Sequence, residues 1–232
     1  MPAGYAFRPR LWIVLLAACA CAACIALAQW QEARARQKRE LAREIDAALA
    51  SPPIPLEAGT DASSVAYRRV AARGSYVAAQ TLLLDNKLRE GRPGYEVVTP
   101  FRLAGSDVHV LVDRGWLPAG PSRDVLPEFP TAAGELRIEA LAIPRFPHAF
   151  ELGRPGPGPV RQNVEVEKFV AETGFAAKAI VLEQLSDLHD GLVRDWPRPD
   201  VGVAMHESYA LQWYSLAALA AVLGVAFFFR RG

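Results

Sequence analysis

Two long apolar segments without charged residues, one near each end of the chain, constrain this sequence more than any other feature. The first, Leu11–Ala28, has 18 residues, and the second, Tyr209–Phe229, has 21. As α-helices they would be roughly 27 Å and 31 Å long, close to the hydrocarbon thickness of a bilayer, about 30 Å. We therefore predict two transmembrane helices, residues 11–28 and 209–229, that flank a water-soluble domain, residues 29–208.

The composition of the whole chain excludes several classes of protein. An apolar content of 51% argues against disorder, and a net charge of +1 argues against a nucleic-acid-binding protein, which normally has a large basic excess. The sequence has no nucleophile elbow, no zinc-protease motif, no Cys-x-x-Cys pair and no dinucleotide fingerprint. We predict a protein that is not an enzyme.

The orientation of the two helices is left open by the charges around them. Arg8 and Arg10 before the first segment would also suit a cleaved signal peptide, but the apolar run continues well past Cys19, which favours a retained helix. These two arginines and the pair Arg230 and Arg231 favour cytoplasmic termini. The basic residues that follow the first helix favour the opposite arrangement, so the charge rule by itself decides neither.

All three cysteines, Cys19, Cys21 and Cys24, lie inside the first apolar segment. Their spacing does not place all three on one face of a helix, which argues against a metal–thiolate site. We interpret them as small residues in a contact between helices.

The middle of the chain begins with a predicted helix, Gln29–Leu49, that the prolines after Ser51 terminate. Gly91–Gly94 has the composition of a turn, and Val164–Thr173 of a short helix closed by Gly174. The predicted strands are Val65–Val77, Thr81–Leu84, Tyr95–Leu103, Val108–Leu117, Gly134–Ile143 and Ala179–Leu185. The expected fold is an α+β membrane protein in which two transmembrane helices flank a β-rich domain of five or six antiparallel strands, with a partly closed barrel as one arrangement.

His206 stands about one turn before the second apolar segment. Helical spacing places it on one face with Trp213, Gly224 and three alanines. A neutral imidazole is a common ligand of metals and of haem iron, and small residues leave room for a flat macrocycle or for another helix. Alternatively, His206 lies at the membrane interface beside an aromatic belt of Tyr209 and Trp213.

A second candidate group lies where the first helix leaves the membrane. Arg34 and Lys38 recur on one helical face with Leu27 and with Trp30 or Gln31. Their cationic groups would bind either lipid phosphates or carboxylates such as the propionates of haem.

Four groups of residues follow one another along the chain: Trp30-Gln31 with Arg34 and Lys38, then Gly91–Pro100, then Val110–Pro118, and finally His206 with Tyr209-Ala210-Leu211-Gln212-Trp213. Together with the two apolar segments, they resemble the motifs of the surfeit-locus-protein-one family of cytochrome c oxidase assembly factors. Ala28 stands where that family usually has Gly, Asp113 where it has Asn, and Ala204-Met205 where it has Asn-Asn.

This resemblance implies a multi-pass protein of the bacterial inner membrane, with the soluble domain in the periplasm and residues 1–10 and 230–232 in the cytoplasm. It implies assembly of cytochrome c oxidase by holding or delivering haem a to the catalytic subunit. His206 would bind the iron, Tyr209 and Trp213 would line the macrocycle, and Arg34 and Lys38 would face the propionates. The expected partners are the catalytic subunit, the lipid bilayer and, as a further candidate, haem a synthase.

An alternative function needs no haem. The chain would then be a membrane scaffold that stabilises the oxidase subunit or its haem-supplying enzyme. The segment Arg114-Gly115-Trp116 and the face of small residues on the second helix would be its protein contacts, although Trp116 is also a candidate core residue of its strand.

Overall fold

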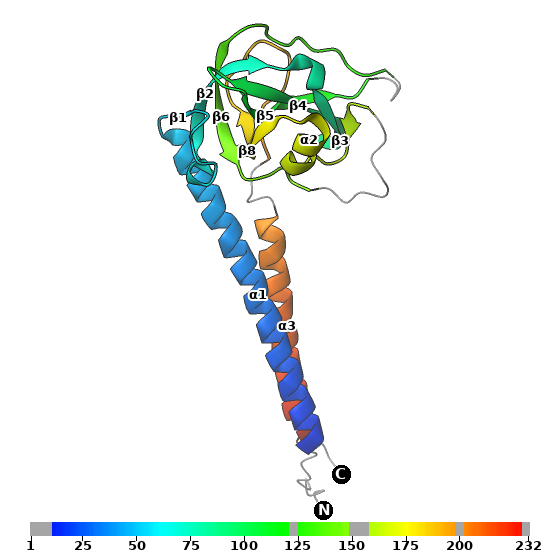
Figure 1. Ribbon diagram of the computed structural model, residues 1–232. Helices are drawn as coiled ribbons and strands as arrows, with labels where there is room; N and C mark the ends of the chain where they lie inside the picture. Colours follow the sequence, from blue (N-terminus) through cyan, green and yellow to red (C-terminus); the bar gives the residue numbers. More distant parts are fainter. Residues whose placement is uncertain (1–10, 121–124, 149–157, 198–201, 229–232) are drawn as a thin grey trace, which may run out of the picture. The chain divides into compact units, whose positions relative to one another are not determined.

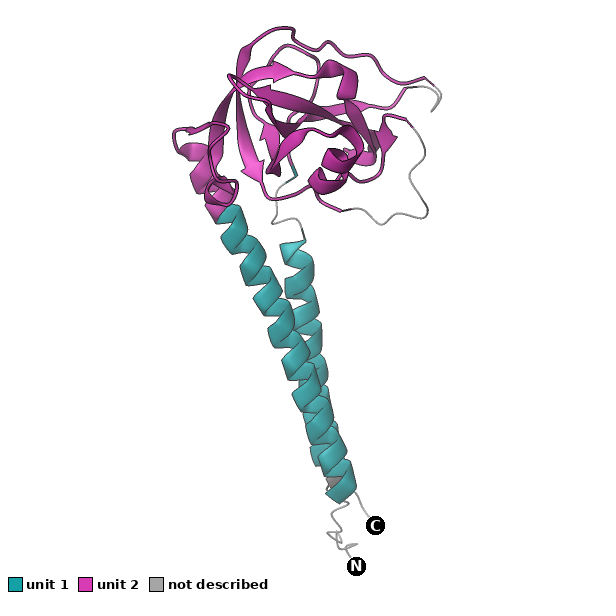
Figure 2. Cartoon of the chain, viewed as in Figure 1, with its two compact units in different colours: residues 1–43, 197–232 teal, residues 44–196 magenta. Residues whose placement is uncertain are grey.

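The computed structural model describes residues 11–120, 125–148, 158–197 and 202–228. The chain divides into two compact units, residues 1–43 with 197–232, and residues 44–196 (Figure 2). The predicted cytoplasmic termini, with Arg8, Arg10, Arg230 and Arg231, lie outside the described residues.

Helix α1 is a single uninterrupted helix, Leu11–Ala50, of 40 residues (Figure 1). The predicted helix Gln29–Leu49 is therefore confirmed, and it continues the first apolar segment without a break. Ser51 ends α1, with its hydroxyl donating to the Ala47 carbonyl at 2.8 Å, and the prolines that follow cannot extend the helix. Residues 209–228 of the second apolar segment lie in α3, Val203–Phe228. By length and composition, both helices are able to cross a membrane.

Helices α1 and α3 run antiparallel and contact each other through small side chains. Ala28 and Ala35 of α1 and Ala210 and Ala217 of α3 are at most 4% exposed. A Cβ atom added at Gly224 would lie only 2.9 Å from the Cβ of Ala17. The small face of α3 therefore packs against another helix, which is one of the two uses predicted for it.

The cysteines follow the same pattern. Cys21 and Cys24 are half-buried and alternate at spacings of three and four with the residues of α1 that face α3, whereas Cys19 is exposed. This arrangement agrees with the interpretation of Cys21 and Cys24 as part of a helix contact, whereas for Cys19, which is exposed, that interpretation is wrong. Among the described residues, no group of three or more His, Cys, Asp or Glu side chains is placed to hold a metal ion.

The second unit is built on one eight-stranded sheet, in the order β1-β2-β6-β8-β5-β4-β3-β7. An additional pairing between β2 and β4 closes β2, β6, β8, β5 and β4 into a five-stranded barrel. The strands are β1 Ile54–Leu56, β2 Arg69–Tyr76, β3 Leu82–Arg89, β4 Arg92–Leu103, β5 Val108–Pro118, β6 Leu136–Ile143, β7 Val160–Arg161 and β8 Ala176–Gln184. The remaining elements are the 3₁₀ turns η1 Ser63–Val65 and η2 Ala78–Gln80 and the helix α2 Val166–Thr173.

Several sequence predictions are confirmed in this unit. The β4–β5 hairpin turns about Gly105, β6 falls within the predicted strand, and α2 ends at Gly174, which has a left-handed φ of 73°. The predicted turn Gly91–Gly94 is wrong in extent. The turn is made by Glu90 and Gly91, and β4 begins at Arg92, because β3 and β4 pair as far as Arg89 and Arg92.

The prediction that all strands are antiparallel is also wrong, because β5 and β8 pair in parallel. The reason is geometric. A closed ring of five strands cannot alternate in direction all the way round, so at least one neighbouring pair must run parallel. The other four pairs of the barrel are antiparallel.

Apolar side chains fill the barrel and also cover part of its outer surface. Phe101, Val112 and Leu182 belong to the interior cluster. Leu111 and Val181, one residue away on the same strands, point outward and pack with Phe169 of α2. Since both faces of β5 are covered, nearly all of its residues are buried, and any polar side chain that it carries must find partners inside the domain.

Candidate functional site

A polar layer interrupts the small-residue contact between α1 and α3. The Nδ1 atom of His206 lies 2.7 Å from Oε1 of Gln31. Both side chains are half-buried, and the backbone N–H of His206 donates to the Gly202 carbonyl at 3.2 Å, within the first turn of α3. Three buried alanines, Ala28 and Ala35 of α1 and Ala210 of α3, flank this layer, so the His–Gln pair is partly protected from water.

The two predicted cations of α1 occupy different environments. Lys38 is half-buried, and its Nζ atom would lie 3.3 Å from a Cβ atom added at Gly202. Its ammonium group is therefore at the start of α3, one turn before His206. Arg34 is exposed, donates to Gln37 Oε1 at 3.2 Å and lies over the ring of Trp30, 5.7 Å from the ring centroid.

The two predicted aromatic residues are also separated. Trp213 is half-buried and shares the α1-facing side of α3 with His206. Tyr209 is 43% exposed. The structure therefore brings His206, Trp213 and Lys38 to the face between the helices, and leaves Tyr209 and Arg34 outside it.

The two flanks of the helix pair differ in chemistry. On one flank, Arg39 forms an ion pair with Glu207, so that a polar contact links the helices. The residues on the opposite flank immediately precede the buried alanines of each helix, an arrangement that places them side by side in an antiparallel pair. They are Leu27 and Arg34 of α1 and Tyr209 and Leu216 of α3.

These positions provide a test of whether the residues suit haem. The donor set fits haem, because the imidazole of His206 can bind iron. The cationic groups of Arg34 and Lys38, about one helical turn apart on α1, can neutralise the propionates. The space between the helices does not fit a macrocycle, because the alanines of the two helices are packed against each other. The exposed flank of Leu27, Arg34, Tyr209 and Leu216 offers aromatic, apolar and cationic groups beside the His206 layer.

Sequence reasoning did not assign Gln31 a role toward His206. The available signal was its spacing: Gln31 continues the series of α1 residues that includes Ala28 and Ala35 and that faces α3. The partner across the contact could be identified only once the register of the two helices was known.

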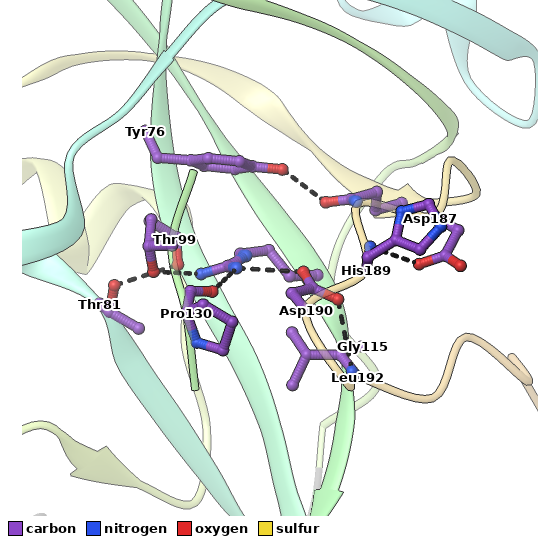
Figure 3. Close-up of polar contacts among 12 residues, drawn as sticks. Tyr76, Thr81, Thr99, Gly115, Pro130, Asp187, His189, Asp190 and Leu192 are labelled. Carbon is purple, nitrogen blue, oxygen red and sulfur yellow. Dashed lines mark hydrogen bonds and ion pairs between the residues drawn. The ribbon is translucent and has the colours of Figure 1, made fainter. Parts of the chain in front are cut away.

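A buried arginine organises one end of the barrel. Arg114 is 0% exposed, donates to the Pro130 carbonyl and to Thr131 Oγ1, both at 2.7 Å, and pairs with Asp190 at 3.1 Å. Its guanidinium also lies over the ring of Tyr76, 4.9 Å from the centroid. Figure 3 shows Tyr76, Pro130 and Asp190 gathered around this position. Asp190 is further bound through both oxygens by Arg194, at 2.7 Å each.

Trp116 belongs to the core. It is 6% exposed, and its indole N–H donates to the Lys87 carbonyl at 2.9 Å. Together with the burial of Arg114, this corrects the suggestion that Arg114-Gly115-Trp116 is an exposed contact for another protein. The reason is that other segments of the chain cover this part of β5: Pro130, Thr131 and Asp190 contact Arg114, and the Lys87 carbonyl accepts from the Trp116 indole.

A cluster of carboxyl groups lies on neighbouring strands of the barrel. Asp113 of β5 is directly opposite Glu183 of β8, and Glu96 of β4 is held by Lys87 at 2.7 Å and Arg89 at 3.0 Å. Burial raises the pKa of Asp113 well above its usual range, and the charges of Glu96 and Glu183 add to the effect. A protonated Asp113 has nearly the shape of an asparagine and, like it, can donate as well as accept a hydrogen bond; asparagine is the residue more usual in the proteins that this sequence resembles.

The same cluster predicts how stability depends on pH. Burial, aided by Glu96, raises the pKa of Glu183 from 4.5 to about 7. Above pH 4.5 the unfolded chain loses this proton while the folded domain keeps it, so the contribution to stability is complete below pH 4.5 and is lost as the pH rises to about 7. The loss is at most about 3 kcal/mol.

We expect Glu183→Gln to remove this dependence. The denaturant concentration at the unfolding midpoint is measured for both chains by tryptophan fluorescence. As the pH rises from about 5 to about 7.5, the midpoint of the wild type should decrease relative to that of the variant. Glu167→Gln on the exposed face of α2 is the matched control and should parallel the wild type. An equal pH slope in wild type and Glu183→Gln would show that Glu183 is ionised in the folded domain.

The fold defines the class of protein: a small closed β-barrel preceded and followed by helices of membrane-spanning length and apolarity. A family model described as the SURF1 family matches residues 18–218, and the chain belongs to this family.

Similar proteins span most of the chain. A SURF1-like protein of Drosophila melanogaster is 28% identical, over 93% of this chain and 76% of its own length. Surfeit locus protein 1 of Mus musculus is 27% identical over 95% of this chain and 76% of its own length. The protein of the same name from Takifugu rubripes is 25% identical over 95% of this chain and 97% of its own. The region shared with the family includes both members of the Gln31–His206 pair.

Proposed function

We propose that this chain assists the assembly of a haem–copper cytochrome c oxidase by binding haem a and delivering it to the catalytic subunit. The observation that carries the proposal is the His206 layer. It places an imidazole with a hydrogen-bonded Nδ1 atom at the end of a helix pair of membrane-spanning length, next to Lys38 and within reach of an exposed aromatic flank. Membership of the SURF1 family supports the link to the oxidase.

Each residue has a defined task in this proposal. His206 offers Nε2 as the ligand of the iron. Tyr209 provides an exposed aromatic surface for the macrocycle, and Trp213 supports His206 from the helix contact. Arg34 and Lys38 supply charge for the two propionates, which are the polar end of the ligand. The cargo brings the redox-active iron, and the chain performs no turnover of its own.

The proposed location follows from the same features. The two helices would anchor the chain in the bacterial inner membrane as a multi-pass protein, with the barrel in the periplasm and both termini in the cytoplasm. The catalytic subunit of the oxidase and the lipid bilayer would be its partners, with haem a synthase as a further candidate. An exit of cargo near the periplasmic surface is consistent with His206 lying at the end of α3 rather than in its middle.

The test is the haem content of the full-length protein, purified in detergent from cells that make haem a. We expect the wild-type protein to contain haem. The haem content of His206→Ala should be lower by a factor of at least about ten, since even the loss of outer-shell partners typically costs 10–100-fold in metal affinity. His148→Ala, an exposed loop histidine, is the matched control and should retain the wild-type content. Equal haem spectra in wild type and His206→Ala would refute His206 as ligand.

The scaffold remains the second candidate function. Its support is the exposed apolar surface of the helix pair, which includes Leu211 and Leu219 of α3 and is suited to contact with other membrane helices. The same preparations distinguish the two proposals. Wild-type protein that contains no haem under these conditions but co-purifies with the oxidase catalytic subunit would favour the scaffold.

A further inference from the structure

The contact between His206 and Gln31 constrains which ring nitrogen carries the proton. The Nδ1 atom faces Oε1 of Gln31 at 2.7 Å. A carboxamide oxygen only accepts hydrogen bonds, so Nδ1 must be the donor, and in the neutral ring the lone pair then resides on Nε2. Which nitrogen of a histidine binds a metal is decided by the hydrogen bond that the other nitrogen makes.

The packing of the helices holds Gln31 in this place. The nearest α3-facing residues before and after Gln31 on α1 are Ala28 and Ala35, which are 0% and 2% exposed. Ala210 of α3 is 4% exposed. These small side chains let the two backbones approach closely enough for a glutamine to span the gap. Little water can then compete for the imidazole N–H.

A cross-helix ion pair contributes to the register in which the helices meet. Arg39 of α1 binds Glu207 of α3, the residue that follows His206. A single polar layer in an otherwise apolar helix contact also specifies register by itself, because any shift would leave its groups without partners.

We propose, on the basis of the function proposed above, that Gln31 is the positioning residue for His206. It holds the imidazole in the Nδ1–H tautomer and in a fixed orientation, so that Nε2 is the atom presented to the haem iron. This role connects two motifs of the chain. Gln31 belongs to the first motif, Trp30-Gln31 with Arg34 and Lys38, and His206 begins the last motif. It also provides an orienting partner for His206 where Ala204-Met205 supplies no side-chain donor or acceptor of this kind.

The first test reads the tautomer directly and needs no haem. Full-length protein with ¹⁵N-labelled histidine, in detergent micelles at about pH 8.5 where imidazole is neutral, is observed by NMR. His206→Gln assigns the signals of His206. We expect the Nδ1–H tautomer in the wild type, its loss in Gln31→Leu and its retention in Gln31→Glu, which keeps an acceptor. Gln29→Leu, an exposed neighbour on the same helix, is the control and should leave the tautomer unchanged.

The second test reads the effect on the ligand. In protein from cells that make haem a, we expect Gln31→Leu to lower haem content by about 10–100-fold. Gln31→Glu should keep the wild-type haem content, and its haem should have a lower midpoint potential because a carboxylate makes the imidazole a stronger donor.

An Nε2–H tautomer in the wild type, or an unchanged tautomer in Gln31→Leu, would overturn the role of Gln31. So would wild-type haem content and spectrum in Gln31→Leu. If wild-type protein contains no haem, the function proposed above fails, and the NMR result still decides whether Gln31 orients His206.

Discussion

Replacement of Arg114 by leucine is expected to destabilise the β-barrel by about 3–5 kcal/mol, the usual cost when one partner of a buried ion pair is removed. Arg114 is fully buried, and the variant leaves Asp190, the Pro130 carbonyl and Thr131 without their common donor. Arg194 still binds Asp190, which limits the loss. The guanidinium also gives up its position over the ring of Tyr76.

Denaturant unfolding of the full chain, followed by tryptophan fluorescence, measures this effect. Arg73→Leu is the matched control, because Arg73 is exposed on strand β2 of the same barrel, and its removal should change stability by no more than about 0.5 kcal/mol. Arg114→Lys keeps the charge but not the forked donor geometry, and it should fall between the two. If Arg114→Leu unfolds at the same denaturant concentration as Arg73→Leu, the network around Asp190 contributes little to stability.

The second large effect is expected for Gly94→Ala. A Cβ atom at Gly94 would lie 2.3 Å from the Leu117 carbonyl oxygen and 2.4 Å from the indole of Trp116. The carbonyl belongs to the β4–β5 ladder, where Gly94 pairs with Pro118, so it cannot move without loss of strand pairing. We expect a cost at the upper end of the range for overpacking, about 3 kcal/mol or more.

Near-ultraviolet circular dichroism and denaturant unfolding of Gly94→Ala measure this cost, since displacement of the Trp116 ring changes both. Gly59→Ala is the control, because nothing lies within 4 Å of the position of its Cβ atom. That variant should unfold like the wild type. Equal midpoints for the two variants would mean that Trp116 and β5 accommodate the extra methyl group at no cost.

Local patterns predicted the elements well where the chemistry is local. The β4–β5 hairpin, the helix α2 with its glycine end at Gly174 and the helical continuation of the first apolar segment were all predicted from neighbouring residues. The parallel pairing of β5 and β8 was not, because it depends on closure of a five-stranded ring by a pairing between β2 and β4. No residue near either strand encodes that closure.

The candidate site shows the same division. His206, Arg34 and Lys38 were identified from residue type and from position relative to the apolar segments. The orienting role of Gln31 was not identified, because Gln31 and His206 are 175 positions apart and meet only through the register of α1 and α3. The burial of Arg114 was not predicted for a related reason: the groups that surround it, Pro130, Thr131 and Asp190, come from other segments of the chain.

The amino-acid sequence by itself determined the two membrane-length helices, the β-rich domain between them and the position of the imidazole at the start of the second helix. Each depends on hydrophobicity or spacing along a single stretch of chain. Only the tertiary structure decided the closed barrel, the burial of Arg114 and the pairing of His206 with Gln31. These depend on which distant segments come into contact, and that is settled by packing and by the need of buried polar groups for partners.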